Sequence, residues 1–467
     1  MPENFKRKEE KELVKRFEES LRNKSGQYFE EEEYGKIIGY YLEKDKISFA
    51  LKAAEQAEEI FPFSIDILLD KSLIFMRTGK FDEAQDLLDR AENFQPNDPE
   101  VMLQKGSLFA LQGEFEDAIT YFKKAEDLAE DKDEVYYNIG FAYQNISDYQ
   151  VAIDYYKKAI EYNINNENAL YELAYCLDVT GELETSLEYY KKFIDKDPYS
   201  EYAWYNLGIV YNKLNDYEKA VDAYEFALAI DEDFSSAYFN MGNAYMNLQQ
   251  YEKALEAYKK TLELEGPSAE AYCCIGAAYE KLEYYDIGIR YYQKASKIDQ
   301  FYHEAWFGVG VCMSFQEKWY EAVHFLKKAV KLDTENPMYT RFLAEAEFKV
   351  GNIVSSLEFY EKAAILAPEI VSTWLDWSII YSDQGEHLKS LEIILNGIEE
   401  LPEESELYYR AVVYLIYAGK YNEAFNYLEQ GLIINYDKHI VLFDFFPKLE
   451  TQKALFKIIS QHKKDNQ

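Results

Sequence analysis

A repeat constrains the fold of this 467-residue chain more than any other feature of its sequence. The segment Ala203–Tyr211 reads AWYNLGIVY, and 34 residues later Ala237–Tyr245 reads AYFNMGNAY. Steps of 34 residues from Trp204 in both directions meet large apolar residues, namely Tyr34, Leu68, Met102, Tyr136, Leu170, Tyr238, Tyr272 and Trp306. A period of this length predicts an array of similar units, each of which buries its apolar face against its neighbours.

Small residues recur at two places in these units. A glycine follows the large apolar residue by four positions at Gly106, Gly140, Gly208, Gly242, Gly276 and Gly310. A small residue comes twelve positions later, as at Ala118, Ala152, Ala220 and Ala254. This spacing predicts two helices per unit, joined by short turns such as TGKFDE and LNDYEK. We expect the glycine and alanine sites to let the two helix backbones approach closely.

The unit resembles the tetratricopeptide repeat in the residues Trp204, Leu207, Gly208, Tyr211, Ala220, Tyr224 and Ala227. Units begin at residues 31, 65, 99, 133, 167, 201, 235, 269, 303, 337, 371 and 405, and positions 1 to 34 are counted from these residues. The resemblance implies an all-α, right-handed superhelical α-solenoid of about twelve 34-residue helix-turn-helix repeats over residues 31–438. It also implies a bacterial-type scaffold built of this repeat alone.

Segments outside the array are expected to cap it. Residues 1–30 predict a charged N-terminal capping helix with an apolar stripe of Leu13, Phe17 and Leu21. A docking or dimerisation helix is the alternative interpretation of that stripe. Residues 439–467 predict a C-terminal capping helix that ends in a frayed tail, KKDNQ. Stripes on both end helices leave open a homodimer through these helices.

The chain is strongly acidic. It contains 50 Lys and Arg residues against 86 Asp and Glu residues, which gives a net charge of −36. Such a charge repels phosphate, so nucleic acid and anionic membranes are poor partners, whereas solubility or a preference for basic partners explains it. No stretch has the apolar length of a signal peptide or a membrane span. With only four cysteines, we expect a soluble, cytoplasmic protein with reduced thiols.

In the tetratricopeptide repeat family, first helices line a concave groove, and positions 2, 5, 6, 9, 12 and 13 point into it. Here aromatic residues occupy several of these positions: Tyr137, Tyr171, Tyr205 and Phe239 at position 5, Phe141 and Tyr175 at position 9, and Tyr202 at position 2. Aromatic rings bury a large area at little entropic cost and suit peptide recognition. Packing between helices is the competing interpretation of these rings.

Position 6 carries Asn138, Asn206 and Asn240, and Asn243 lies nearby. An amide that donates and accepts can hold the backbone of an extended peptide. The pattern is similar to the asparagine ladder of the O-linked N-acetylglucosamine transferases, although Glu172 and Cys274 interrupt it and no catalytic domain is present. The carboxylate clamp of co-chaperones requires lysine at position 5, where the repeat of Asn243 has Phe239, so the sequence disfavours that type of ligand.

We find no catalytic constellation, and we expect no enzyme activity, no metal and no cofactor. The five histidines are scattered, and Cys273 and Cys274 are neighbours on a helix, where side chains point about 100° apart. The sequence therefore predicts a scaffold or adaptor that binds a peptide segment of a partner protein in its concave groove. A regulatory or assembly subunit that binds a folded partner through its acidic convex face or its ends is the main alternative, and an enzyme with an unrecognised site is the third.

Overall fold

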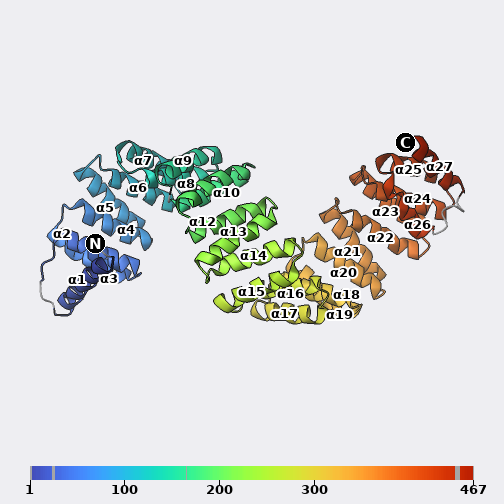
Figure 1. Cartoon of the computed structure of the whole chain (residues 1–467), viewed down its shortest axis with the longest axis horizontal. Coiled ribbons are helices and arrows are strands. Elements are labelled where there is room, and N and C mark those ends of the chain that lie inside the picture. The colour runs from blue at the N-terminus through green and yellow to red at the C-terminus, as the bar shows by residue number, and fades with distance from the viewer. Residues whose placement is uncertain (1–2, 24–26, 165, 447–452, 466–467) are drawn as a thin grey trace. The chain divides into compact units, whose positions relative to one another are not determined.

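The computed structural model describes residues 3–23, 27–164, 166–446 and 453–465 (Figure 1). These residues form helices and no strand, which confirms the predicted all-α class. The chain divides into two compact units, residues 1–232 and 233–467, and each is described by itself. The handedness of the superhelix concerns the arrangement of the whole chain and stays a prediction.

The first unit contains helix α1 and then helices in consecutive packed pairs. The bounds are α1 Glu3–Asn23, α2 Glu31–Glu43, α3 Ile47–Ile60, α4 Ile65–Arg77, α5 Phe81–Phe94, α6 Pro99–Gln112, α7 Phe115–Leu128, α8 Asp133–Asn145, α9 Tyr149–Tyr162, α10 Glu167–Val179, the 3₁₀ turn η1 Leu183–Thr185, α11 Ser186–Lys196, α12 Glu201–Lys213 and α13 Tyr217–Ile230. The first helices of the pairs begin 34 residues apart, from α2 to α12.

The second unit continues the same pairing. The bounds are α14 Ser235–Asn247, α15 Tyr251–Glu265, α16 Ala269–Lys281, α17 Tyr285–Ile298, α18 His303–Phe315, α19 Trp319–Leu332, α20 Pro337–Lys349, α21 Ile353–Leu366, α22 Val371–Asp383, α23 His387–Glu400, α24 Ser405–Tyr417, α25 Tyr421–Ile434, the 3₁₀ turn η2 Asp437–Val441, α26 Leu442–Phe445 and α27 Lys453–Asp465. Helix-turn-helix repeats, as predicted, build both units.

The turn inside each repeat has one residue in the left-handed region. It lies at position 15 in every case: Asp45, Gly79, Gly113, Ser147, Gly181, Asn215, Gln249, Glu283, Glu317, Gly351, Gly385 and Gly419. A left-handed residue ends a helix because its amide can return to a carbonyl of the last turn. The TGKFDE and LNDYEK segments therefore form turns as the sequence predicts, and the position tolerates residues other than glycine.

The glycine at position 8 has a different role from the one expected. A Cβ built on Gly140 would lie 2.8 Å from the ring of Tyr156, and one on Gly208 would lie 2.5 Å from the ring of Tyr224. The glycine thus makes room for a ring of the second helix and not for its backbone. Close backbone approach occurs at position 20, where a Cβ on Gly288 would lie 3.2 Å from a carbonyl oxygen of the first helix.

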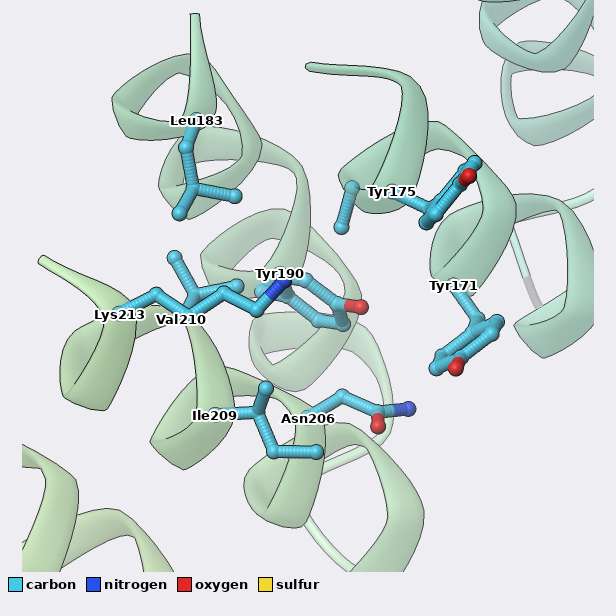
Figure 2. Close-up of a pocket in the computed structure, with 9 residues that line it drawn as sticks. Tyr171, Tyr175, Leu183, Tyr190, Asn206, Ile209, Val210 and Lys213 are labelled. Carbon is cyan, nitrogen blue, oxygen red and sulfur yellow. The ribbon is translucent and has the colours of Figure 1, made fainter. Parts of the chain in front are cut away.

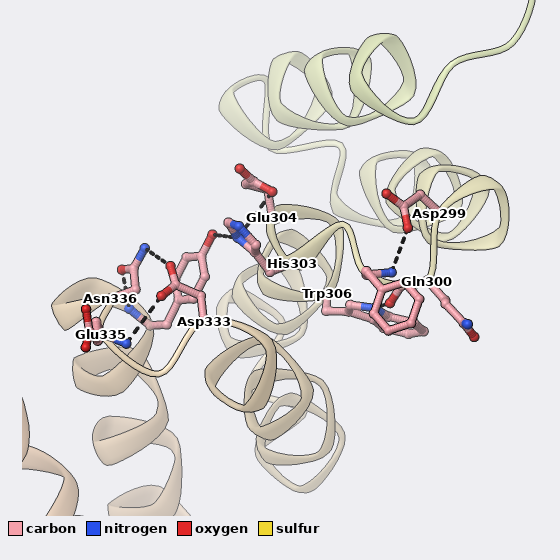
Figure 3. Close-up of polar contacts among 10 residues, drawn as sticks. Asp299, Gln300, His303, Glu304, Trp306, Asp333, Glu335 and Asn336 are labelled. Atoms are coloured by element: carbon pink, nitrogen blue, oxygen red, sulfur yellow. Dashed lines mark hydrogen bonds and ion pairs between the residues drawn. The ribbon is translucent and has the colours of Figure 1, made fainter.

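Tryptophan residues at position 4 donate hydrogen bonds to the loops that precede their repeats. The indole Nε1 of Trp306 donates to the carbonyl of Gln300 at 2.9 Å (Figure 3), and Trp204 and Trp374 make the same bond six residues back. In the next loop, the side chain of Asn336 caps α20. These contacts explain why a tryptophan or tyrosine marks the start of many repeats.

The apolar stripes of the end helices are covered within their own units. Leu13 and Phe17 of α1 are buried in one core with residues of α2 and α3, and Leu21 packs against it. Leu455 and Ile459 of α27 are buried in the core of α24 and α25. The stripes that suggested a homodimer are therefore already covered by residues of the same unit. Helix α27 extends to residue 465, so much of the tail expected to fray is helical, and residues 466–467 lie outside the described part.

Candidate functional site

A cavity of about 120 Å³ opens between the first helices α10 and α12 of the first unit. Figure 2 shows Tyr171 and Tyr175 on the α10 side and Asn206 on the α12 side, with Tyr190 of α11 between them. The two exposed tyrosines lie one helical turn apart, because their spacing is four residues. Leu183 of η1 and Ile209, Val210 and Lys213 of α12 complete the wall with Ala174. The lining is mostly apolar with a few polar groups, which is typical of a binding site.

The repeat that borders the cavity has an alanine at position 8 of its first helix. Ala174 stands there in the fifth repeat, opposite the ring of Tyr190, whereas the fourth and sixth repeats place Gly140 and Gly208 opposite the equivalent rings. A Cβ at those glycines would clash with the ring, so the ring of Tyr190 cannot sit equally close to its first helix. The second helix of this repeat also starts irregularly, with the 3₁₀ turn η1 before α11.

Several of the predicted groove residues present their rings to solvent. The exposed fractions are 52% for Tyr171, 44% for Tyr175, 52% for Tyr202 and 36% for Phe141. The four rings lie on the first helices of three successive repeats, and Tyr171 and Tyr175 line one cavity. Exposure leaves these four side chains available to a ligand, and their place in a groove stays a prediction.

Other aromatic residues predicted for the groove also pack against rings of the second helices. Tyr137 lies 5.9 Å from the buried ring of Tyr156, and Tyr205 lies 5.9 Å from that of Tyr224. Both position-5 rings are half-buried. Tyr137 also stacks on Phe141 at 6.4 Å and so supports a more exposed ring. Inter-helix packing thus holds for these two side chains, and ligand contact by them stays a prediction.

The predicted asparagines differ in their surroundings. Asn138 and Asn206 are half-buried on α8 and α12, and Asn206 borders the cavity. Glu172, which interrupts the predicted ladder, accepts a hydrogen bond from Gln144 Nε2 at 2.7 Å. Its carboxylate is therefore held to the neighbouring first helix.

Three predicted residues belong to the second unit. Phe239 is half-buried and lies 5.6 Å from the ring of Tyr258, and Asn240 is half-buried on the same helix. Asn243 accepts a hydrogen bond from the Tyr258 hydroxyl at 2.7 Å. This bond gives Asn243 a structural role that the sequence pattern did not reveal.

Sequence reasoning missed part of the cavity wall. Ile209 and Lys213 stand at positions 9 and 13, which the family pattern assigns to the groove, so that pattern could have found them. Tyr190 and Leu183 belong to the second half of the repeat, and first-helix positions give no signal for them. The Lys213 ammonium is paired with Asp178.

The first-helix face is acidic on the N-terminal side of the cavity. Asp66, Glu100 and Glu134 occupy position 2 on α4, α6 and α8, which pack side by side, and Asp70 lies one turn further along α4. Burial together with the nearby Asp66 raises the pKa of Asp70 to about 7. Burial also raises the pKa of Glu100 and Glu134, with a further contribution from neighbouring carboxylates. These groups thus form one coupled set across three helices.

The cysteines are poor nucleophiles. Burial raises the pKa of Cys176 and Cys274 to about 12, and it also raises the pKa of Cys273 and Cys312. A thiol with such a pKa is protonated at neutral pH and does not attack a substrate. Among the described residues, no group of three or more His, Cys, Asp and Glu side chains could hold a metal ion. None of the described helices combines the length and apolar character that crossing a membrane requires.

Family models of the tetratricopeptide repeat match successive segments in the middle of the chain. The matches cover residues 106–147, 133–166, 168–200, 201–234, 235–266 and 269–302. The chain belongs to the tetratricopeptide repeat family. Membership of this family makes it a scaffold for protein–protein interaction.

Solved structures include several that are similar to parts of this tetratricopeptide repeat protein. MamA is 30% identical with a TM-score of 0.33, and the match covers 37% of this chain and 94% of MamA. YrrB, described as a TPR protein with an unusual peptide-binding site, is 22% identical with a TM-score of 0.33 over 39% of this chain and 95% of YrrB. The APC/C Cut9–Hcn1 structure is 13% identical with a TM-score of 0.40 over 92% of this chain and 96% of that one. The comparison with curated proteins gave no match.

Proposed function

We propose that the chain is an adaptor that holds an extended peptide segment of a partner protein on the first-helix face of its first unit. The observation that carries this proposal is the cavity beside the exposed rings of Tyr171 and Tyr175. An apolar side chain of the peptide enters the cavity, and the two rings cover it. Tyr137, Phe141, Tyr202 and Tyr205 extend the aromatic surface to both sides.

Amide groups hold the backbone of the ligand in this proposal. Asn206 borders the cavity, Asn138 stands at the same repeat position two repeats earlier, and each amide can donate to a carbonyl and accept from an N–H group. Such bonds do not depend on the side chains of the ligand, so specificity comes from the cavity. In the second unit, Phe239, Asn240 and Asn243 are proposed as contacts of the same kind.

The proposal includes a location and an organisation for the chain. We propose a cytoplasmic protein without enzymatic activity, in which residues 31–438 form twelve repeats and the end helices cap them.

Selection from a random-peptide display library tests the groove. The double variant Tyr171→Ala, Tyr175→Ala removes two exposed rings, and Tyr199→Ala is the matched control because its ring is 79% exposed in a loop. We expect selected peptides to bind the intact chain and the control, and to bind the double variant at least about tenfold more weakly. Equal binding to all three proteins would contradict the proposal, provided that circular dichroism shows the same helix content.

A cavity on the opposite side of the first unit favours the alternative of a folded partner. It measures about 290 Å³ between the second helices α11 and α13, and the stacked rings of Trp204 and Phe226 form one wall. Phe226 is 53% exposed. If Phe226→Ser abolishes binding of a partner and the double tyrosine variant does not, the convex face is the interface.

A further inference from the structure

The first-helix face of the first unit carries negative charge that the chain itself does not neutralise. In the described part of the chain, Asp66, Asp70, Glu100 and Glu134 form no ion pair with a lysine, arginine or histidine. The basic residues of this face have other partners. Lys36 pairs with Glu32 at 2.6 Å, Arg77 donates to the carbonyl of Leu42, and Lys213 pairs with Asp178, so they leave the four carboxylates without a counter-charge.

Keeping the Asp70 carboxylate costs folding stability. The pKa of Asp70 is raised to about 7, well above its ordinary value, because the folded chain buries it beside Asp66. Ionisation at neutral pH is therefore less favourable in the folded state than in the unfolded state. An asparagine or glutamine would avoid this cost. Groups with a perturbed pKa of this kind cluster at functional sites.

The helices that carry the acidic residues Asp66, Glu100 and Glu134 are followed by the helix that borders the Tyr171–Tyr175 cavity. Asp66, Glu100 and Glu134 lie on α4, α6 and α8, and the next first helix, α10, carries Tyr171 and Tyr175. A single extended segment that crosses these helices in order meets three acidic steps and then an apolar one. Neighbouring first helices lie about 10 Å apart, and an extended chain advances about 3.3 Å per residue. One step thus corresponds to about three residues of ligand.

We propose that the occupant of this face is a cationic peptide segment, with lysine or arginine side chains against Asp66, Glu100 and Glu134 and an apolar side chain in the Tyr171–Tyr175 cavity. The inference rests on the proposed function, which it sharpens by naming the chemical class of the ligand. Charge complementarity selects this occupant, since an acidic segment would be repelled along three successive repeats. The segment has a basic residue at every third position and an aromatic or aliphatic residue at one end.

Fluorescence anisotropy with synthetic peptides tests the proposal on the full chain. The probe has lysine at three positions, each three residues apart, followed by phenylalanine after the same interval, and a second probe has the reverse order. Matched probes replace the lysines by glutamine or by glutamate. We expect the better lysine probe to bind at least about tenfold more tightly than its glutamine counterpart, and this preference to shrink as salt is added.

Protein variants locate the effect. The triple variant Asp66→Asn, Glu100→Gln, Glu134→Gln removes three charges from the face, and Glu83→Gln, Asp117→Asn, Asp154→Asn removes the same number from exposed sites on second helices. We expect the first variant to lose the preference for lysine and the second to keep it. Equal effects of both variants would overturn the inference, because the attraction would then come from net charge alone.

The outcomes separate this inference from the proposed function. If lysine and glutamine probes bind equally and the double tyrosine variant loses both, the groove binds peptides without a charge preference, and the cationic ligand is wrong. If the lysine probe binds the double tyrosine variant as well as the intact chain, both proposals fail at this site. Circular dichroism with the same helix content as the intact chain shows that the triple variant is folded.

Discussion

The fifth and sixth repeats are both helix pairs, and they differ in how the tyrosine of the second helix packs against the first helix. The sixth repeat places Gly208 under the ring of Tyr224, which is fully buried against its first helix. The fifth repeat has Ala174 at the same position, and a cavity lies beside Tyr190. The fifth repeat, which borders the cavity, thus differs from the sixth by the methyl group at position 8 and by the 3₁₀ turn η1 before its second helix.

Electrostatics give a second comparison, at position 6 of two repeats. Asp70 in the first unit has no basic partner among the described residues, whereas Asp376 in the second unit accepts a hydrogen bond from Arg341 at 3.1 Å. Burial raises the pKa of both carboxyls, and Arg341 counteracts the effect at Asp376. Position 6 thus carries a carboxylate that is paired with an arginine in the second unit, and one without a basic partner among the described residues of the first unit.

Gly208→Ala has the largest expected effect. The new Cβ would lie 2.5 Å from the ring of Tyr224, so the ring or the helix must move. We expect a loss of about 1–3 kcal/mol in the free energy of unfolding, measured by urea denaturation. Glycine to alanine in an open helix stabilises instead. A neutral or stabilising result would break the comparison, because the ring would then not require glycine.

Ala174→Gly makes the fifth repeat resemble the sixth. Without the methyl group, the ring of Tyr190 can move closer to α10, and the cavity should shrink. We expect peptides selected on the intact chain to bind about tenfold more weakly, while Tyr171 and Tyr175 stay exposed. An unchanged affinity for these peptides in the same anisotropy assay would mean that peptide binding in the cavity does not depend on the methyl group of Ala174.

Asp70→Asn should stabilise the fold more than Asp376→Asn does at pH 8. Asp70 is ionised there at a cost to the fold, so we expect its replacement to stabilise by the order of 1 kcal/mol, whereas Asp376→Asn removes a partner of Arg341. The intact chain should become more stable as pH falls from 8 towards 5, because Asp70 takes up its proton in the folded state first. Asp70→Asn should lack this share of the increase in thermal unfolding scans, and an identical increase in the variant would contradict the assignment.

The turn residues give the smallest effects. Position 15 is Gly181 in the fifth repeat and Asn215 in the sixth, both with positive φ. We expect Gly181→Ala to lower the free energy of unfolding by about 1 kcal/mol, and Asn215→Gly to change it by only a few tenths. Equal losses from both substitutions would show that the two turns do not share one backbone geometry.

The sequence determined the features that depend on spacing along the chain. The 34-residue register gives the first residue of each first helix, the position of the turn and the family, because a helix and its turn form from residues close in sequence. The register also placed Tyr171 and Tyr175 on the first-helix face, where the structure has them exposed.

Only the tertiary structure decided what those residues contact. Each of three features involves more than one helix. They are the packing of the Tyr224 ring on Gly208, the cavity beside Ala174 and Tyr190, and the hydrogen bond from Tyr258 to Asn243. The coupling of Asp66 with Glu100 joins two repeats. These contacts depend on how closely the helices pack, and a repeating pattern states which residues recur without stating the distances between their helices.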